Sequence, residues 1–234
     1  YIVTNLLKKK FSIKNEIKIN IKKNIPIGSG LGGGSSNAAS ILNFFNKKFK
    51  LKLSKSDKSQ ICQTIGMDVP FFIDGGLQFA EGMGERLKSV PPVFKEHFFV
   101  LVFPKFKVST PWAYANINKR LPSKKKLYNL LAQKKTINFN LFGNDFESIV
   151  IPRYPEIRDI KKHLLSENAI FSSLSGSGST VFGIFNNFDE ATNSSKMLKK
   201  KKYHTVVATP IYRWNNGGSS NGRTHGFGPW NRGS

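Results

Sequence analysis

A glycine-rich segment with the sequence IPIGSGLGGGSSNAAS runs from Ile25 to Ser40 and leads directly into a stretch with helical spacing. Glycine lacks a Cβ, so such a backbone can curve into a nest of N–H donors that approaches a ligand closely. The start of a helix adds unpaired N–H groups and a partial positive charge, which together attract phosphate. Ser35 and Ser36 add hydroxyls for phosphate oxygens or a metal ion. The segment therefore predicts a phosphate-binding loop.

Two common phosphate motifs do not describe this loop. A Walker A sequence ends in Gly-Lys-Ser or Gly-Lys-Thr, and neither is present here. A dinucleotide-binding fingerprint needs a βαβ context and a downstream acidic residue, and neither is evident. The structural alternative is a flexible linker, but linkers rarely run straight into an amphipathic helix.

The elements around the loop mix strands and helices, which predicts an α+β protein with a seam near Pro91-Pro92. Between residues 11 and 26, Phe and Ile occupy odd positions and alternate with mostly polar residues, which is typical of strands. The spacing of Ser54 and Asp57 resembles a helix capping box. The expected elements are a helix at 4–9 capped by Thr4; strands within 11–26; helices at 36–48 and 54–66; strand, Gly75-Gly76 turn and strand within 69–87; a strand at 97–104; helices at 112–119, 127–134, 145–150 and 157–166; strand, glycine turn and strand within 169–185; a helix at 190–200; and a strand at 204–208.

The formal net charge of +23 invites a nucleic-acid-binding interpretation. Lysine supplies nearly all of this charge and occurs with abundant Asn, Ile and Phe, so a bias toward A+T-rich codons also explains it. Neither an aromatic RNA-binding signature nor zinc-finger spacing accompanies the lysine clusters. We expect no specific nucleic-acid partner, only salt-sensitive non-specific adhesion.

The chain has 234 residues, enough for one large domain or two small ones. Its longest apolar run is too short to span a bilayer, and its start does not read as a signal peptide. The single cysteine, Cys62, excludes an internal disulfide framework and fits a reducing compartment. We expect a soluble, cytoplasmic protein without a membrane partner.

Five motifs occur along the chain: P-x-G-S-G-L-G-G-G-S-S-N-A-A, DVPFF, FAEGMGE, STP and LSGSGSTVF. In this order and spacing they resemble the GHMP kinases, small-molecule kinases named for galactose, homoserine, mevalonate and phosphomevalonate. The resemblance covers roughly Asn5 to Ile211 and is greatest to members that act on a cytidine diphosphate-linked methylerythritol. It implies a two-lobed α+β fold, with substrate held between a nucleotide lobe and a ferredoxin-like domain. We expect the nucleotide lobe at 1–90, the substrate-binding domain at 91–212 and a disordered tail at 213–234.

The resemblance also implies a reaction. The γ-phosphoryl group of ATP, with Mg²⁺, is transferred to the 2-hydroxyl of that substrate in the non-mevalonate route to isoprenoid precursors. Asn5 and Leu6 match positions that line the adenine pocket, and Lys23 matches a basic residue near the base, with Lys22 as an alternative. The full set of ATP-binding residues that it implies is Asn5, Leu6, Lys23, Pro26, Gly28, Gly30, Leu31, Gly32, Gly33, Gly34, Ser35, Ser36 and Asn37.

Asp68, in GMDVP, matches the catalytic aspartate of the family, whose carboxylate accepts the proton of the attacking hydroxyl. Position alone would also fit an aspartate in a turn, and Met67 stands where the family usually has a small residue. Tyr114 matches an aromatic that holds cytosine, although its helical spacing also suits a core residue. The turn near Ser177 has a plain β-turn as its alternative. The substrate-binding residues implied by the resemblance are Asp68, Met83, Thr110, Pro111, Tyr114, Gly176, Ser177 and Gly178, and it assigns no metal ligands or oligomeric state.

Both ends of the sequence depart from the family pattern. The family usually opens with K-x-N and G-Y-H segments, which supply a catalytic lysine and an aromatic for cytosine, and this sequence starts beyond both. Either the chain has lost that segment or its start was set too late, and we expect residues 1–234 alone to be catalytically silent. The tail SSNGRTHGFGPWNRGS suggests read-through into a transfer RNA gene, with a species-specific tail or cloning remnant as the alternative.

Two other functions compete with this interpretation. One is a different GHMP kinase that acts on mevalonate-type or sugar substrates, against which Tyr114 and the EGMGE motif argue. The other, from a different class, is a basic nucleic-acid-binding module.

Overall fold

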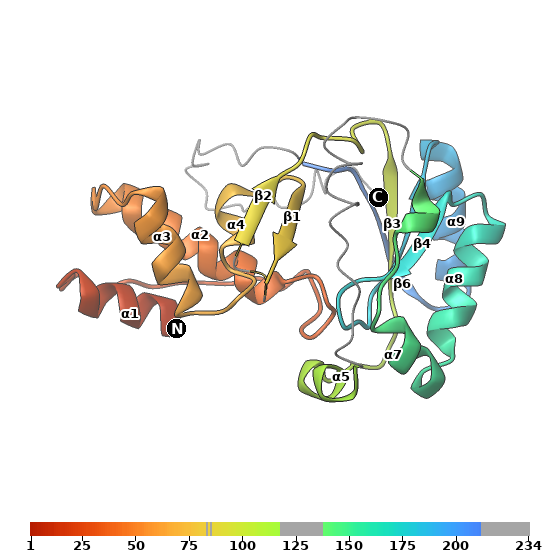
Figure 1. The fold of residues 1–234 in the computed structure, drawn as a ribbon, viewed down its shortest axis with the longest axis horizontal. Coiled ribbons are helices and arrows are strands. Elements are labelled where there is room, and N and C mark those ends of the chain that lie inside the picture. Colours follow the sequence, from red (N-terminus) through yellow and green to blue (C-terminus); the bar gives the residue numbers. More distant parts are fainter. Residues whose placement is uncertain (83, 85, 118–137, 212–234) are drawn as a thin grey trace. The chain divides into compact units, whose positions relative to one another are not determined.

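The computed structural model describes residues 1–82, 84, 86–117 and 138–211, which form two compact units (Figure 1). The first unit contains residues 1–27 and 32–90, and the second contains residues 28–31 and 91–211. The chain thus enters and leaves the second unit within the glycine-rich loop, whose first half we had expected in the first lobe. Met83, the helix expected at 127–134 and the tail at 213–234 lie outside the described residues.

The second unit is built on a four-stranded antiparallel sheet. Its strands are β3 (Phe98–Phe103), β4 (Phe171–Leu174), β5 (Val181–Phe185) and β6 (His204–Ala208), in the spatial order β4-β5-β3-β6. Two longer helices, α8 (Glu156–Ser166) and α9 (Phe188–Lys200), pack on the sheet side by side (Figure 1). The shorter elements are α5 (Thr110–Asn116), η1 (Phe139–Leu141) and α7 (Glu147–Arg153). The β-α-β-β-α-β order and this strand arrangement are those of a ferredoxin-like fold.

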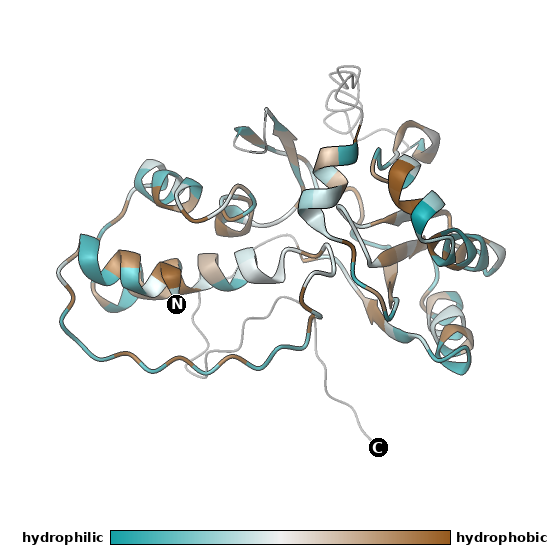
Figure 2. Ribbon diagram, turned by 90° about the horizontal axis from the view of Figure 1, so that it is seen from below, coloured by the Kyte–Doolittle hydropathy of each residue, from teal (hydrophilic) through white to brown (hydrophobic). Residues whose placement is uncertain are grey.

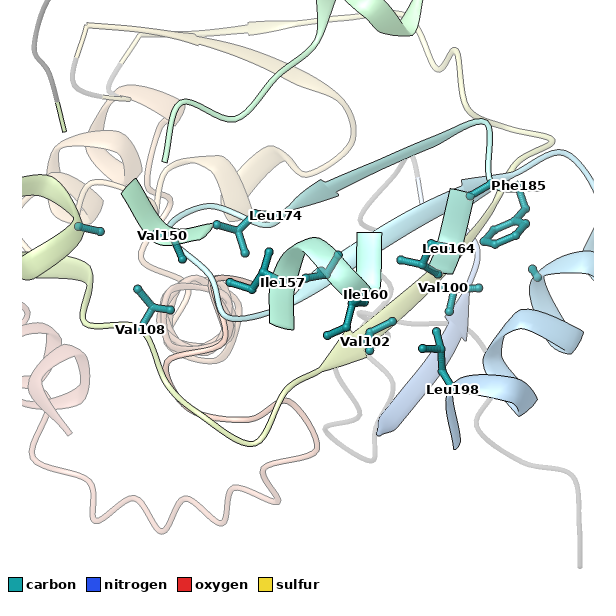
Figure 3. Packing of buried hydrophobic residues seen from close by; sticks show 14 residues of the cluster. Val100, Val102, Val108, Val150, Ile157, Ile160, Leu164, Leu174, Phe185 and Leu198 are labelled. Carbon is teal, nitrogen blue, oxygen red and sulfur yellow. The ribbon is translucent and has the colours of Figure 1, made fainter. Parts of the chain in front are cut away.

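The core of the second unit lies between the sheet and the two long helices. Ile157, Ile160 and Leu164 follow one another at intervals of three and four along α8, which puts them on one face of the helix. They are almost fully buried against β3 residues such as Val100 and Val102 (Figure 3). This apolar layer makes the unit a rigid support for the loops at the ends of its strands.

The first unit is mainly helical. It contains α1 (Ile2–Lys10), α2 (Gly33–Lys48), α3 (Lys55–Gln63), α4 (Phe71–Asp74) and the two-stranded ladder of β1 (Gln78–Glu81) and β2 (Arg86–Ser89). Leu42 and Phe45 of α2 are fully buried in its core, together with Leu7 of α1 and Cys62 of α3. Burial raises the pKa of the Cys62 thiol to about 11, so this side chain stays protonated and serves as packing.

Several local predictions are confirmed. The backbone N–H of Asp57 donates to Ser54 Oγ over 3.1 Å, and the N–H of Ser54 donates to Asp57 Oδ2 over 2.9 Å, which completes the capping box of α3. The strands predicted at 97–104 and 204–208 are present as β3 and β6. Among the described helices, none is long and apolar enough to cross a membrane.

The strands predicted between Phe11 and Pro26 are wrong. This segment is extended, and hydrophobic and hydrophilic residues alternate along it in Figure 2, but it belongs to neither sheet of the described residues. A strand needs a neighbour that accepts and donates its backbone hydrogen bonds, and β1 and β2 pair with each other. Ile13 and Ile17 pack on the core of the first unit, whereas Ile21 is 53% exposed.

Helix starts and one short element also differ from expectation. Residues 71–74 form a helical turn, not a strand, because Pro70 has a helical φ of −56° and Gly75, at φ +64°, ends the turn. Thr4 does not cap the first helix, which begins at Ile2 and buries Thr4 within it. The helix after the loop begins at Gly33, three residues before the predicted start.

Candidate active site

The first half of the glycine-rich loop lies directly against a glycine turn of residues 175–178 in the second unit. Gly30 has φ +77°, and a Cβ at this position would lie 2.1 Å from the carbonyl oxygen of Ser175. Ser175 Oγ donates to the carbonyl oxygen of Gly30 over 2.9 Å, and Thr180 N–H donates to that of Ser29 over 3.2 Å. Only glycine fits at position 30, because any side chain would meet backbone atoms of the turn.

The second half of the loop is the N-terminus of α2. Gly32, at φ +62°, occupies the N-cap position, where no described side chain caps the helix, and no acidic residue lies in the first turn. A Cβ built on Gly34 would meet nothing within 4 Å, so this backbone is open to an approaching group. The first N–H groups of the helix thus remain available for an anion.

Lys23 adds a positive charge beside this helix start. Its Nζ lies 3.9 Å from the position that a Cβ on Gly33 would occupy. A cation next to a helix N-terminus is unfavourable by itself, because both carry positive charge. An anion bound between them would be attracted by both, so this arrangement favours a phosphate group.

Asp68 lies in a turn that is attached to the same helix start. A Cβ on Gly32 would lie 2.7 Å from ring carbons of Phe72, so α4 packs closely against the loop. Val69, next to Asp68, is buried in the core and fixes the turn, while the Asp68 side chain is exposed. The exposed carboxylate can accept a proton from a bound hydroxyl group.

Two predicted substrate residues meet in the second unit. Thr110 Oγ1 and Ser177 Oγ are 3.0 Å apart, at the start of α5 and in the glycine turn respectively. Tyr114 is 61% exposed and makes a T-shaped contact with Phe146 at 5.0 Å between ring centroids. Much of the Tyr114 ring is therefore accessible to solvent, where a nucleobase could stack.

The other predicted residues are placed as follows. Asn5 and Leu6 lie on α1, which packs against α2; Asn5 is exposed and Leu6 contacts the core of the first unit. Leu31 packs on the sheet of the second unit with Leu101 and Phe103. Pro26 and Gly28 lie at the beginning of the glycine-rich loop, and Ser35, Ser36 and Asn37 lie in the first turns of α2. Pro111 lies at the start of α5, and Gly176 and Gly178 lie in the glycine turn.

Sequence reasoning did not single out Ser175, Thr180 or Phe72, although each contacts the loop. Ser175 and Thr180 flank the glycine turn, and Phe72 stands in the DVPFF motif, so their motifs were recognised but their contacts were not. Thr180 is fully buried, and no described group bonds to its Oγ1. A signal was present in the repeated Gly-Ser pattern of both turns, which suits backbones that approach each other closely.

A substitution at Gly34 separates ligand contact from folding. We expect Gly34→Ala to leave the free energy of unfolding unchanged or raise it by up to about 1 kcal/mol, because alanine favours the helix and its Cβ has free space. The same methyl group should lower the affinity for ADP about fivefold if the helix start binds phosphate, since it would then lie between the phosphate and the backbone. Calorimetric titration with ADP checks this prediction, and an unchanged ADP affinity would show that phosphate does not approach Gly34.

Comparisons with known proteins confirm the resemblance to the GHMP kinases. The family model described as "GHMP kinases N terminal domain" matches residues 1–76, and the model described as "GHMP kinases C terminal" matches residues 124–204. The 4-diphosphocytidyl-2-C-methyl-D-erythritol kinase of Pelodictyon phaeoclathratiforme is 39% identical over 193 residues, which are 80% of this chain and 67% of that protein. The chain thus spans about two thirds of that relative.

Solved structures show the same similarity in three dimensions. A crystal structure of 4-(cytidine 5'-diphospho)-2C-methyl-D-erythritol kinase has a TM-score of 0.72 and 27% identity, covering 88% of this chain and 75% of that one. A mevalonate kinase structure has a TM-score of 0.68 at 14% identity, covering 90% and 75% of the two chains, and it shows the shared fold alone.

Proposed function

The chain belongs to the GHMP kinase family, and we propose that it transfers the γ-phosphoryl group of ATP to the 2-hydroxyl of 4-diphosphocytidyl-2-C-methyl-D-erythritol. The observation that carries phosphoryl transfer is the uncapped start of α2 with Lys23 beside it. The choice of substrate rests on the similarity to kinases of that name.

In this proposal the glycine-rich loop holds the phosphates of ATP. Backbone N–H groups at the start of α2 donate to phosphate oxygens. Ser35 and Ser36 lie in the first turn of the same helix, so their hydroxyls can add contacts to the phosphates. The Lys23 ammonium balances part of the phosphate charge. Because the reaction develops charge on the transferred group, these fixed donors also stabilise its transition state.

Asp68 is the proposed general base. The acceptor hydroxyl loses its proton as its oxygen bonds to phosphorus, and a placed carboxylate can take that proton. The close packing of Phe72 on Gly32 supports this role, because it attaches the Asp68 turn to the helix start that would hold the phosphates.

Mg²⁺ is part of the proposal through the nucleotide. The described residues contain no group of three or more His, Cys, Asp and Glu side chains that could hold a metal ion by themselves. Mg²⁺ often binds through substrate phosphates, water and only one or two protein ligands. The loop fits that mode, with Ser35 and Ser36 as the candidate oxygen ligands; bound Mg²⁺ would neutralise phosphate charge.

The cytidine end of the substrate is proposed to lie at Thr110, Pro111 and Tyr114, next to the turn of Gly176, Ser177 and Gly178. The hydrogen-bond contact of Thr110 with Ser177 supports a shared site, and the exposed ring of Tyr114 supports stacking. Met83 belongs to the same expected set but lies outside the described residues.

We expect Tyr114→Ala to weaken the binding of cytidine diphosphate about tenfold, because stacking of a base on an aromatic contributes about 1–3 kcal/mol. The affinity for ADP should not change. Tyr114→Phe keeps the ring and should bind cytidine diphosphate as the parent does. Fluorescence or calorimetric titration measures both ligands, and equal binding by the alanine variant would remove Tyr114 from the site.

A thermal-shift comparison tests the substrate class. Cytidine diphosphate should raise the unfolding temperature, because a ligand that binds only the folded state stabilises it. Mevalonate at the same concentration should not. Stabilisation by mevalonate without stabilisation by cytidine diphosphate would favour a different small-molecule kinase of the family.

A further inference from the structure

Asn144 makes three hydrogen bonds at the point where β4 runs into the glycine turn of residues 175–178. Its Nδ2 donates to the carbonyl oxygen of Leu174 over 2.8 Å and to that of Gly176 over 2.7 Å. Its Oδ1 accepts from the backbone N–H of Phe146 over 3.0 Å. Both amide hydrogens and the amide oxygen are thus used, which only a side-chain amide can do here.

Glu147, three residues later, holds the same strand end from the side. Its Oε1 accepts from the Leu174 N–H over 2.8 Å and from Ser173 Oγ over 2.9 Å, and its other oxygen pairs with Lys161. The side chains of Glu147 and Lys161 are 18% and 20% exposed. A shielded ion pair fixes its own geometry better than an exposed one, so the end of β4 is tightly held.

The turn that Asn144 holds also contacts the loop. Ser175 Oγ donates to the carbonyl oxygen of Gly30. A Cβ built on Gly176 would lie 3.3 Å from that same carbonyl oxygen of Gly30. Ser177, in the same turn, contacts Thr110. Within the second unit, hydrogen bonds therefore join Asn144 to the turn, and the turn to Gly30 and Thr110.

We propose that Asn144 is a positioning residue for the reaction. Its amide fixes the turn of residues 175–178, and the turn fixes the first half of the phosphate loop and the Thr110–Ser177 contact. This inference rests on the proposed nucleotide-binding function of the loop. Asn144 itself touches no reacting atom in this account; it acts through Ser175 and Gly30.

The substitution Asn144→Asp separates the contacts of Asn144 with Leu174 and Gly176 from its contact with Phe146. Aspartate keeps an oxygen for the Phe146 N–H, but it places a carboxylate oxygen against the two carbonyl oxygens that the amide contacted. The bonds to Leu174 at the end of β4 and to Gly176 in the turn are lost and replaced by repulsion, whereas the bond to Phe146 is kept. The ADP affinity of the folded variant should fall about tenfold, which corresponds to about 1.4 kcal/mol.

Asn187 provides a matched control. It caps α9 through Oδ1, which accepts from the N–H groups of Asp189 and Glu190, and within the described residues no hydrogen bond is recorded for its Nδ2. Asn187→Asp therefore makes the same chemical change, but no hydrogen bond from a side-chain amide nitrogen is lost. Its ADP affinity should equal that of the parent.

Calorimetric titration of ADP with Mg²⁺ and hydrogen exchange of the free protein test the proposal together. In Asn144→Asp, the amides of Gly178 and Thr180 should exchange faster than in the parent, while those of β6 stay protected. Parent-like ADP affinity and parent-like exchange at the turn would overturn the positioning role. A parent protein that does not bind ADP would contradict the proposed function, and the exchange result would still decide whether Asn144 fixes the turn.

A second variant covers the case in which Asn144→Asp does not fold. Ser175→Ala removes only the hydroxyl that reaches Gly30. We expect it to fold with slightly lower stability and to bind ADP about fivefold more weakly, because the loop loses one of its fixed contacts. If it binds ADP as the parent does, the turn does not position the loop and the proposal is wrong.

Discussion

Asp68→Asn should reduce turnover by a factor of about 10²–10⁴, the usual contribution of general acid–base catalysis. The amide is nearly the same size as the carboxylate but cannot accept the proton of the acceptor hydroxyl. Because the side chain is exposed and Val69 anchors its turn, the fold should be unaffected. The affinity for ADP should also stay close to that of the parent, since the phosphates are held by the loop. Steady-state kinetics with the full gene product and titration with ADP measure the two effects.

Asp74→Asn is the matched control for this variant. Asp74 ends α4 and forms an exposed ion pair with Lys55, with 2.7 Å between Oδ2 and Nζ. Exposed ion pairs contribute about 0–1 kcal/mol to stability, so its loss should leave turnover unchanged. If Asp68→Asn turns over within a few-fold of the parent, Asp68 is not the general base.

Gly30→Ala should lower the affinity for ADP on the order of 10²-fold. An L-residue at φ +77° is strained by about 1–2 kcal/mol, and its Cβ would lie 2.1 Å from the carbonyl oxygen of Ser175. The loop can relieve this clash only by moving away from the turn, which breaks the bond from Ser175 Oγ to Gly30. Titration with ADP, with the unfolding temperature as a check on folding, measures the effect.

The control for Gly30→Ala is Gly143→Ala. Gly143 lies in the same unit, a Cβ there would meet nothing within 4 Å, and its φ lies outside the positive range. This alanine should leave both stability and ADP affinity close to the parent values. An ADP affinity of Gly30→Ala within threefold of the parent would show that contact with the turn does not hold the loop in its binding conformation.

Local signals in the sequence predicted much of the fold. The capping box depends on Ser54 and Asp57, which are only three residues apart, and β3 is a continuous run of apolar neighbours. Both features could therefore be predicted from the sequence. The alternation between Phe11 and Pro26 was read as strand although it carries no information about a pairing partner. The Pro70 and Gly75 pair limits residues 71–74 to one helical turn, against the strand preference of Phe and Ile.

The candidate site was predictable only in part for a related reason. The glycine-rich loop is a contiguous motif, and its resemblance to the GHMP kinases supplied roles for Asp68, Thr110 and Tyr114. The bond from Ser175 to Gly30 joins residues 145 apart, and Asn144 reaches Gly176 across 32 residues. No spacing rule relates such positions. Only the folded chain brings them together.

The most direct test of the account is phosphoryl transfer itself, measured with the product of the full gene, ATP and Mg²⁺. Each of 4-diphosphocytidyl-2-C-methyl-D-erythritol and mevalonate is supplied in turn, and release of ADP is followed while mass spectrometry identifies the phosphorylated product. The account predicts that ADP release depends on the cytidine-linked substrate and that this substrate gains one phosphoryl group on its 2-hydroxyl. Phosphorylation of mevalonate instead, or no transfer to the cytidine-linked substrate by a protein that binds ATP, would contradict it.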